Sequence, residues 1–158
     1  MTSTEFVYTT YIKTTPERLW QALTDPAFTS QYWGVTFETD WTVGSPVTWH
    51  QGGVTITDPN QTVLEYEPCR RLAYTWHALT QEHSAWAGFS QEFHRKAVSE
   101  RRSQATYELE PHGQSVKLTL THDGFEPGSV VLESVSQGWP SLLSSLKTLL
   151  ETGHPLPA

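Results

Sequence analysis

One stretch near the C-terminal end constrains the fold more than any other. Residues 136–153 read SQGWPSLLSSLKTLLETG, and the apolar pattern extends back to Val131. At about 100° per residue the apolar side chains fall on one stripe about 120° wide, as expected for a helix that lies on a core. The stripe consists of Val131, Leu132, Val135, Trp139, Leu142, Leu143, Leu146, Leu149 and Leu150. The rest of the chain therefore has to supply a broad apolar surface for a long helix to cover.

Gly138 and Pro140 lie inside this stretch. The apolar phase continues through both, which favours one helix with a kink near Gly138. The alternative is that Pro140 begins a separate helix, in whose first turn proline is favoured. Ser129 is the expected N-cap, and Gly153 is placed to end the helix.

The N-terminal part predicts a strand and two short helices. The stretch EFVYTTYIKT is rich in β-branched and aromatic residues, which favour a strand. In TTPERLWQALTDP, Pro16 lies in the first turn of a predicted helix, and Leu19, Trp20 and Leu23 form its apolar face. PAFTSQYWG predicts a second short helix that stops at Gly34.

Alternation of apolar and polar residues predicts an antiparallel sheet with one buried face. The pattern from Val35 to Ala78 is strand-like, broken by VGSP, QGG and DPN. In RLAYTWHA the buried face carries Leu72, Tyr74 and Trp76, with Ala73, Thr75 and His77 opposite. Two later strands place these side chains inward: Ala105, Tyr107, Leu109, Val116, Leu118, Leu120 and His122.

Residues 81–102 interrupt this succession of strands and are too many for a hairpin loop. Trp86, Phe89 and Phe93 recur at helical spacing, which predicts a short helix across one end of the sheet. That helix is either a movable lid, with these three aromatic residues facing a ligand, or a permanent plug of the core.

Composition excludes several classes of function. The net charge of −7 argues against nucleic-acid binding and against docking on anionic membranes. No apolar run approaches the roughly 18 residues of a membrane span, and no signal peptide is visible. Cys69 is the one cysteine, which excludes an internal disulfide. These features predict a cytoplasmic location, and without a phosphate loop or dinucleotide motif no cofactor is expected.

The chain contains seven Trp, six Tyr and six Phe. Such an excess indicates either a large aromatic core or a cavity lined by aromatic side chains. If there is a cavity, the alternation and the segments flanking it predict which side chains line it. These are Trp33, Trp41, Trp49, Glu65, Tyr74, Trp76, Tyr107, His122, Trp139 and Leu143.

No catalytic or metal-binding motif is evident. His122 precedes Asp123, but consecutive strand residues point to opposite faces, so a paired general base is not predicted. If Glu65, which alternates with Val63, points inward, Arg70 or Arg71 is its expected partner; a solvated edge position is the favoured alternative. The seven histidines show no ligand spacing typical of a metal site.

The order of these predicted elements resembles the START-like, or SRPBCC, superfamily. Within it, the chain is similar to the bacterial branch named for the C-terminal domain of the activator of heat-shock-protein-90 ATPase. The stretches that carry the resemblance span nearly the whole chain: TTPERLWQALTDP, YEPCRRLAYTW, YELEPHG, VKLTLTHDGFEPGS and GWPSLLSSLKTLLETG.

The resemblance implies an α+β helix-grip fold in one domain covering residues 1–158. A curved antiparallel sheet of about seven strands would wrap on the C-terminal helix, with an internal cavity between them. Members of the superfamily bind or process hydrophobic small molecules, and some aromatic-polyketide cyclases use this cavity.

Three hypotheses for the function follow. The first is a non-catalytic module that binds a small hydrophobic or aromatic ligand in the cavity. The second is an enzyme, such as a cyclase or hydrolase, with His122, Tyr107 or Glu65 as acid or base. The third is a protein-interaction role like that of the chaperone activator, although this chain lacks room for the additional chaperone-binding domain of the eukaryotic activator. A homodimer is an open alternative.

Overall fold

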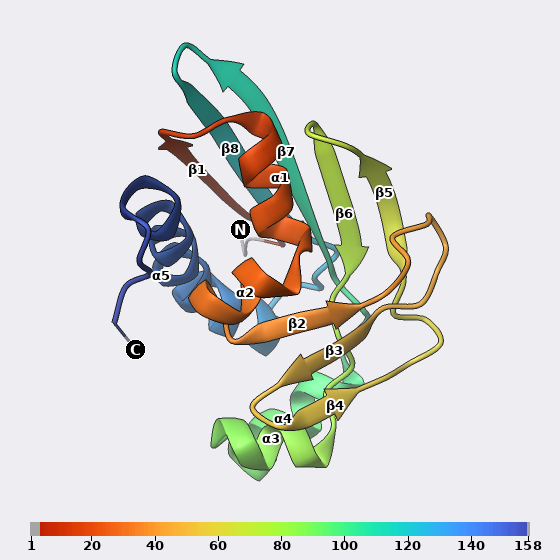
Figure 1. The fold of residues 1–158 in the computed structure, drawn as a ribbon. Coiled ribbons are helices and arrows are strands. Elements are labelled where there is room, and N and C mark those ends of the chain that lie inside the picture. Colours follow the sequence, from red (N-terminus) through yellow and green to blue (C-terminus); the bar gives the residue numbers. More distant parts are fainter. Residues whose placement is uncertain (1–3, 158) are drawn as a thin grey trace.

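Antiparallel strands form most of the fold in the computed structural model, which describes residues 4–157. A five-stranded sheet has the order β1 (Phe6–Ile12), β8 (Ser115–Asp123), β7 (Gln104–His112), β6 (Arg71–Thr75), β5 (Val63–Glu67). A three-stranded sheet has the order β2 (Val35–Glu38), β3 (Thr48–Gln51), β4 (Val54–Ile56). An isolated bridge between Pro46 and Thr62 joins the two sheets, which together curve around the interior (Figure 1).

Residues 4–157 contain eight strands, whereas about seven were expected. The QGG stretch that interrupts the strand pattern is the turn of a hairpin, in which Gln51 of β3 pairs with Val54 of β4. Gly52 and Gly53 both have positive φ, at 60° and 83°. Two-residue hairpin turns of this kind need positive φ at both central positions, which glycine adopts without strain.

Both predicted N-terminal helices are present, as α1 (Pro16–Thr24) and α2 (Pro26–Tyr32). The Thr15 side chain caps α1 by accepting a hydrogen bond from the backbone N–H of Arg18 at 3.2 Å. Asp25 ends α1, and its carboxylate caps α2 by accepting from the N–H of Ala27 at 2.9 Å. The Thr15 and Asp25 side chains thus mark where the two helices begin.

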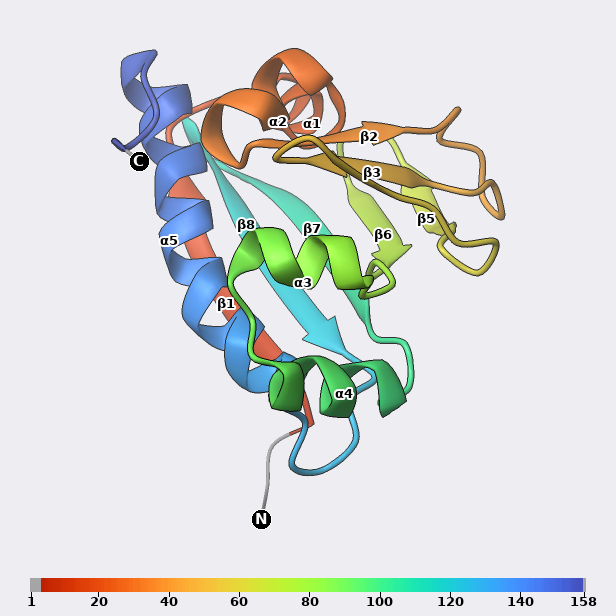
Figure 2. The ribbon, with the colours of Figure 1, turned by 90° about the horizontal axis from the view of Figure 1, so that it is seen from below.

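The C-terminal stretch forms one helix, α5 (Val130–Thr152), with Pro140 inside it. The single-helix interpretation is therefore correct. Ser129 caps its start by accepting from the N–H of Leu132 at 3.0 Å. Near its other end, the Lys147 ammonium donates to the carbonyl of Tyr11 at 2.7 Å, and the Glu151 carboxylate accepts from the N–H of Lys13 at 2.8 Å. These contacts fix α5 along β1 (Figure 2).

Two helices, not one, occupy the segment between β6 and β7. They are α3 (Gln81–Ala87) and α4 (Gln91–Ser99), and they lie at the end of the fold away from α1 (Figure 1). Gly88 has φ of 76°, a left-handed conformation that ends α3 and lets the chain turn into α4. The expectation of a single short helix is wrong because Gly88 ends α3 and divides the helical segment in two.

Candidate functional site

Most of the side chains expected to line a cavity instead pack against one another. Trp49, Tyr74, Tyr107, Trp139 and Leu143 are each at most 2% exposed. The Trp49 and Tyr74 rings meet edge to face with centroids 5.8 Å apart, and Tyr107 meets Trp139 in the same way at 6.1 Å. An edge-to-face arrangement of this kind is a favoured geometry for a pair of aromatic rings. The region between the sheet and α5 is thus the aromatic core of the fold, which we call the central core.

The two tyrosine hydroxyls of the central core bond to each other. The Oη atoms of Tyr74 and Tyr107 lie 3.0 Å apart. Burial raises the pKa of both phenols above their ordinary value. Both are therefore neutral at physiological pH, and each phenol has its partner inside the core.

His122 is fully buried, and its two ring nitrogens are both engaged. The Trp139 indole N–H donates to Nδ1 at 3.0 Å, and Nε2 lies 2.8 Å from Ser103 Oγ. Because an indole nitrogen only donates, Nδ1 carries no proton, and Nε2–H donates to Ser103. Burial, reinforced by the neighbouring His77, lowers the pKa of His122 to about 3. The ring is a neutral structural group, so the geometry does not favour its use as a general base.

Of the two positions considered for Glu65, the solvated edge is correct and the inward orientation is wrong. The strand pairing shifts between Val63 and Glu65, so the extra residue turns Glu65 to the outer face while Val63 stays buried. The carboxylate is instead half-exposed and accepts a hydrogen bond from the Arg71 guanidinium at 2.6 Å. Arg71 also contacts Glu108, at 3.3 Å. The expected pairing with an arginine is thus present, but outside the core.

Trp33, Trp41 and Trp76 lie at the margin of the central core and are partly buried. Trp41 stacks on Tyr66 with ring centroids 6.1 Å apart and lines neither of the two hollows described next. Trp33 and Trp76 stack on each other at 6.2 Å, and both line hollows described next.

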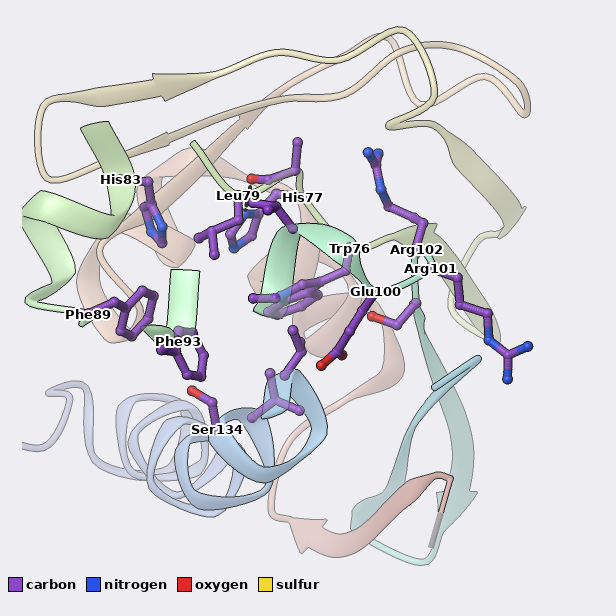
Figure 3. Close-up of a pocket in the computed structure, with 16 residues that line it drawn as sticks. Trp76, His77, Leu79, His83, Phe89, Phe93, Glu100, Arg101, Arg102 and Ser134 are labelled. Carbon is purple, nitrogen blue, oxygen red and sulfur yellow. Dashed lines mark hydrogen bonds between the residues drawn. The ribbon is translucent and has the colours of Figure 1, made fainter. Parts of the chain in front are cut away.

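A pocket of about 280 Å³ lies between the end of β6, helices α3 and α4, and the first turns of α5. We call it the end pocket. Figure 3 shows the rings of Trp76, His77, His83, Phe89 and Phe93 arranged around it. The remaining lining residues are Ala78, Leu79, Ala97, Val98, Glu100, Arg101, Arg102, Ser103, Val131, Ser134 and Val135.

The two histidines of the end pocket present ring nitrogens without protons. The His77 Nδ1 lies 2.7 Å from the Ala78 carbonyl oxygen, which only accepts, so Nδ1 carries the proton and Nε2 does not. The His83 Nε2 lies 3.1 Å from Gln51 Oε1 and donates to it, which leaves Nδ1 as the acceptor. That Nδ1 is buried and has no hydrogen-bond partner among residues 4–157. Desolvation lowers the pKa of His77 to about 4 and also lowers that of His83.

The charged side chains at the end pocket are already paired. Glu100 accepts from the N–H of Val130 at 2.8 Å and from the Ser129 hydroxyl, at the start of α5. Arg101 donates to the carbonyls of Gly124 and Phe125, both at 2.8 Å. Arg102 pairs with Asp58 at 3.3 Å. Figure 3 shows both arginine side chains pointing away from the histidines.

The aromatic residues of the predicted lid divide between pocket and surface. Phe89 and Phe93 line the end pocket, with ring centroids 4.6 Å apart. Trp86 does not line it: its side chain is 49% exposed and rests against Gly52 of the β3–β4 turn. A Cβ at position 52 would collide with the indole, so only glycine permits this contact. Trp86 therefore contributes to the seating of α3 on that turn.

A wider hollow of about 760 Å³ lies between α2 and α5, and we call it the side groove. Trp33, Trp76 and Trp139 form its aromatic part. Trp76, Ser134 and Val135 line both hollows, so the side groove and the end pocket meet at these residues. The other side-groove residues are Ser30, Gln31, Tyr32, Gly34, Ser134, Gly138, Ser141, Leu142, Ser145, Leu156 and Pro157.

Neither a cluster of metal ligands nor a membrane-spanning helix is present among the described residues. Over residues 4–157, no three or more His, Cys, Asp or Glu side chains are grouped so that they could hold a metal ion. In the same part of the chain, no helix has both the length and the apolar character needed to cross a membrane.

The end-pocket histidines were missed from the sequence. Alternation placed His77 on the outer face, but β6 ends at Thr75, so the strand period no longer applies two residues later. His83 stands three residues after Thr80, whose hydroxyl caps α3 by accepting from the His83 N–H at 3.1 Å. The sequence contained this capping spacing. The contact of His83 with Gln51 of β3 depends on the tertiary fold.

The family of the chain follows from its sequence. Residues 13–151 match the model of the family described as Activator of Hsp90 ATPase homolog 1-like protein. The chain belongs to this family. The assignment to the START-like superfamily, made above on resemblance, is thereby confirmed, and so is the helix-grip fold with its curved antiparallel sheet and long C-terminal helix.

Solved structures agree with the family in fold. Protein MLL2253 from Mesorhizobium loti is 26% identical with a TM-score of 0.71, and the match covers 93% of this chain and 96% of that one. The Aha1 dimer from Colwellia psychrerythraea is 21% identical with a TM-score of 0.66, over 96% and 98%. DynU16, described as a putative protein in the dynemicin biosynthetic locus, is 20% identical with a TM-score of 0.71, over 97% and 49%. No curated protein matches this chain in sequence.

Proposed function

We propose that this protein binds a small molecule with an aromatic or apolar body in the end pocket. The observation that carries the proposal is the end pocket itself, a hollow of about 280 Å³ lined by the rings of Trp76, Phe89 and Phe93.

The walls of the end pocket support an aromatic or apolar ligand. Trp76, Phe89 and Phe93 present rings to it, and Val131 and Val135 of α5 close the opposite side. Ligand sites commonly measure about 300–1,000 Å³. A volume of about 280 Å³ lies near the lower end of that range, which favours a ligand of one or two rings.

Binding is favoured over catalysis by the positions of the three acid–base candidates. His122 and Tyr107 have their partners inside the central core, and Glu65 lies on the outer face. None of the three is among the residues that line the end pocket. The neighbour DynU16, by its description, belongs to a biosynthetic locus, which agrees with a small-molecule role for this fold.

The first test is native mass spectrometry of the purified protein, followed by a denatured spectrum. A mass that disappears on denaturation is the expected result, and it would identify the ligand directly. Val131→Phe should abolish this retained mass because it fills the pocket from α5. Val7→Phe is the matched control, since Val7 is 53% exposed on β1 and lies away from both hollows.

Two results would contradict the proposal. One is a ligand that Val131→Phe retains as well as Val7→Phe does, which would place it elsewhere, with the side groove as the next site to test. The other is an apo mass together with no binding of aromatic probes at high concentration. Either result would remove the end pocket as the functional site.

A chaperone partner and a homodimer remain predictions. The family description refers to an activator of Hsp90 ATPase, and one neighbour is an Aha1 dimer. At 21% identity that neighbour supports the fold alone. Native mass spectrometry also reports the oligomeric state, so the same spectrum tests the homodimer.

A further inference from the structure

The end pocket and the side groove are adjoining parts of one longer depression. Trp76, Ser134 and Val135 line both hollows, so the two share a wall. Figure 2 shows α4 beside the first turns of α5 and α2 beside its later turns. A molecule held in the end pocket can therefore extend along α5 toward α2.

The face that α5 presents to this depression is regular. Its lining residues recur at Val131, Ser134, Gly138, Ser141 and Ser145. Alternating steps of three and four residues keep side chains on one face of a helix. At 1.5 Å per residue this face is about 21 Å long. It is therefore longer than a ligand of one or two rings.

Gly138 keeps the middle of this face open. After proline, glycine is the residue least favoured inside a helix, yet Gly138 lies within α5. A Cβ at position 138 would point into open space, so close packing does not require glycine there. The absent side chain leaves room in the side groove, which Gly138 lines.

The side groove is lined without charge. Of the described residues that line it, none is Asp, Glu, Lys, Arg or His, although charged residues make up 17% of the chain. A charged group placed in the groove would lose water without gaining a partner of opposite charge. The net charge of −7 would in addition repel an anion. A neutral ligand therefore suits the groove best.

Neutral hydrogen-bonding groups in the side groove are exposed and available. The hydroxyls of Ser30 and Ser141 form no hydrogen bond within residues 4–157, and both residues are exposed. Gln31 is also exposed and donates one amide hydrogen to the Ala27 carbonyl at 2.7 Å. Its amide oxygen and its second amide hydrogen stay available. A ligand can therefore both donate to and accept from this wall.

The partly buried indoles of Trp33 and Trp76 supply the aromatic part of the side groove. Neutral hydroxyl and amide groups beside aromatic rings match the chemistry of a sugar. The C–H faces of a sugar ring pack on aromatic surface, while its hydroxyls donate and accept hydrogen bonds.

We propose that the two hollows form one elongated site for an aromatic ring joined to a neutral polyhydroxylated group such as a sugar. The aromatic ring occupies the end pocket, and the hydroxylated group lies in the side groove along α5. This inference rests on the proposed function and specifies its ligand class as an aromatic glycoside or a similar neutral conjugate.

The test uses three probes with the same aromatic body: 2-naphthol, 2-naphthyl β-D-glucoside and 2-naphthyl β-D-glucuronide. Their affinities are measured by titration calorimetry. We expect the glucoside to bind about tenfold more tightly than 2-naphthol, as one or two additional hydrogen bonds would give. The glucuronide has a carboxylate in place of one CH₂OH group, and it should bind no more tightly than 2-naphthol.

Variants of α5 assign the two parts of the ligand to the two hollows. Gly138→Leu fills the side groove, so the glucoside should fall to the affinity of 2-naphthol while 2-naphthol itself is unchanged. Gln137→Leu is the matched control, because Gln137 is exposed and lines neither hollow. It should leave all three affinities unchanged. Val131→Phe, in the end pocket, should weaken both neutral probes.

The outcomes separate this inference from the proposed function. Equal binding of 2-naphthol and its glucoside would overturn the elongated site and leave the end pocket standing. A glucuronide that binds as tightly as the glucoside would overturn the preference for a neutral group. A glucoside whose advantage survives Gly138→Leu would overturn the role of the side groove. If none of the probes binds, the inference and the proposed function both fall.

Two measurements guard against a variant that fails to fold. Leucine favours a helix more than glycine does, so urea titration should show Gly138→Leu to be no less stable than the unaltered protein. In ¹⁵N-labelled unaltered protein, the glucoside should shift the backbone amide resonances of Gln31 and Ser141, whereas 2-naphthol should shift them less. Unmoved resonances at saturating glucoside would contradict the proposal directly.

Discussion

The central core and the end pocket are both built from aromatic and imidazole rings, yet only the end pocket encloses a hollow. In the central core the Tyr74 and Tyr107 hydroxyls bond to each other, and both nitrogens of His122 are engaged. In the end pocket the rings of His77 and His83 keep unshared lone pairs. Aromatic content alone therefore does not distinguish a packed interior from a binding site. Unpaired polar atoms do not distinguish the two either, because Nε1 of Trp49 in the central core is also buried without a partner among residues 4–157. Free space does: the end pocket measures about 280 Å³, whereas the rings of the central core pack against one another.

The largest effect should come from truncating the central core. Trp139→Ala removes a side chain that is 2% exposed and takes away the donor to His122. We expect the free energy of unfolding to fall by about 3–5 kcal/mol in urea titrations. Trp86→Ala, at a side chain 49% exposed, should cost less than about 1 kcal/mol. Similar losses for the two tryptophans would show that the core is not packed as described.

Acidification should weaken the fold through the same core. The unfolded chain protonates a histidine near pH 6.5, whereas His122 in the fold does so at about 3. Between these values the unfolded state binds more protons, so stability falls as the pH falls. From pH 7 to pH 5 the loss from His122 is about 2 kcal/mol. His77 adds to it in the same direction.

Urea titrations at pH 7 and pH 5 measure this loss, and His122→Phe supplies the control. The variant is less stable at pH 7 but has one titrating group fewer, so its stability should change less between the two pH values. An equal decrease in both proteins would assign the pH dependence to other groups.

A smaller effect is expected from unpairing the two tyrosines. Tyr107→Phe leaves the buried Tyr74 hydroxyl without its partner and should cost about 1–2 kcal/mol. Replacing both tyrosines by phenylalanine removes both polar atoms, so the double variant should lose less than the sum of the two single losses. Additive losses in denaturant titrations would mean that the hydroxyl pair contributes little.

The smallest effect on stability is expected at the end pocket. His83→Phe removes a buried acceptor that has no partner, and it loses the bond to Gln51 in exchange. These two changes have opposite effects on stability. The free energy of unfolding, measured by urea titration, should therefore change by less than about 1 kcal/mol. A loss as large as that of Tyr107→Phe would indicate that His83 serves the fold and not a ligand.

The fold was largely predictable because its signals are local. Alternation identified the inner face of β6, β7 and β8, including Tyr107 and His122, and the apolar stripe identified α5 as one helix. Glu65 was misplaced because the bulge before it is a property of the pairing between β5 and β6. Local alternation contains no information about such a shift.

The candidate site was predictable only in part. The sequence indicates which rings face inward, but not whether they leave space between them, so Trp49 and Tyr74 were expected at a cavity that they fill. Phe89 and Phe93 were recognised by their helical spacing, and both line the end pocket. His77 and His83 were missed because their roles depend on where a strand ends and on a contact with Gln51.

The tautomer of His122 determines where the hydroxyl hydrogen of Ser103 points at the wall of the end pocket. Because Trp139 donates to one side of the imidazole, the other side donates to Ser103, whose oxygen is thereby used as an acceptor. The hydroxyl hydrogen of Ser103 is then left to point elsewhere, and Ser103 lines the end pocket. The Trp139 indole on α5 does not line the end pocket. Through His122 it nevertheless determines whether the Ser103 oxygen, which does line the pocket, accepts or donates a hydrogen bond. Replacing Trp139 by phenylalanine would free the imidazole to reverse that polarity without altering any residue of the pocket.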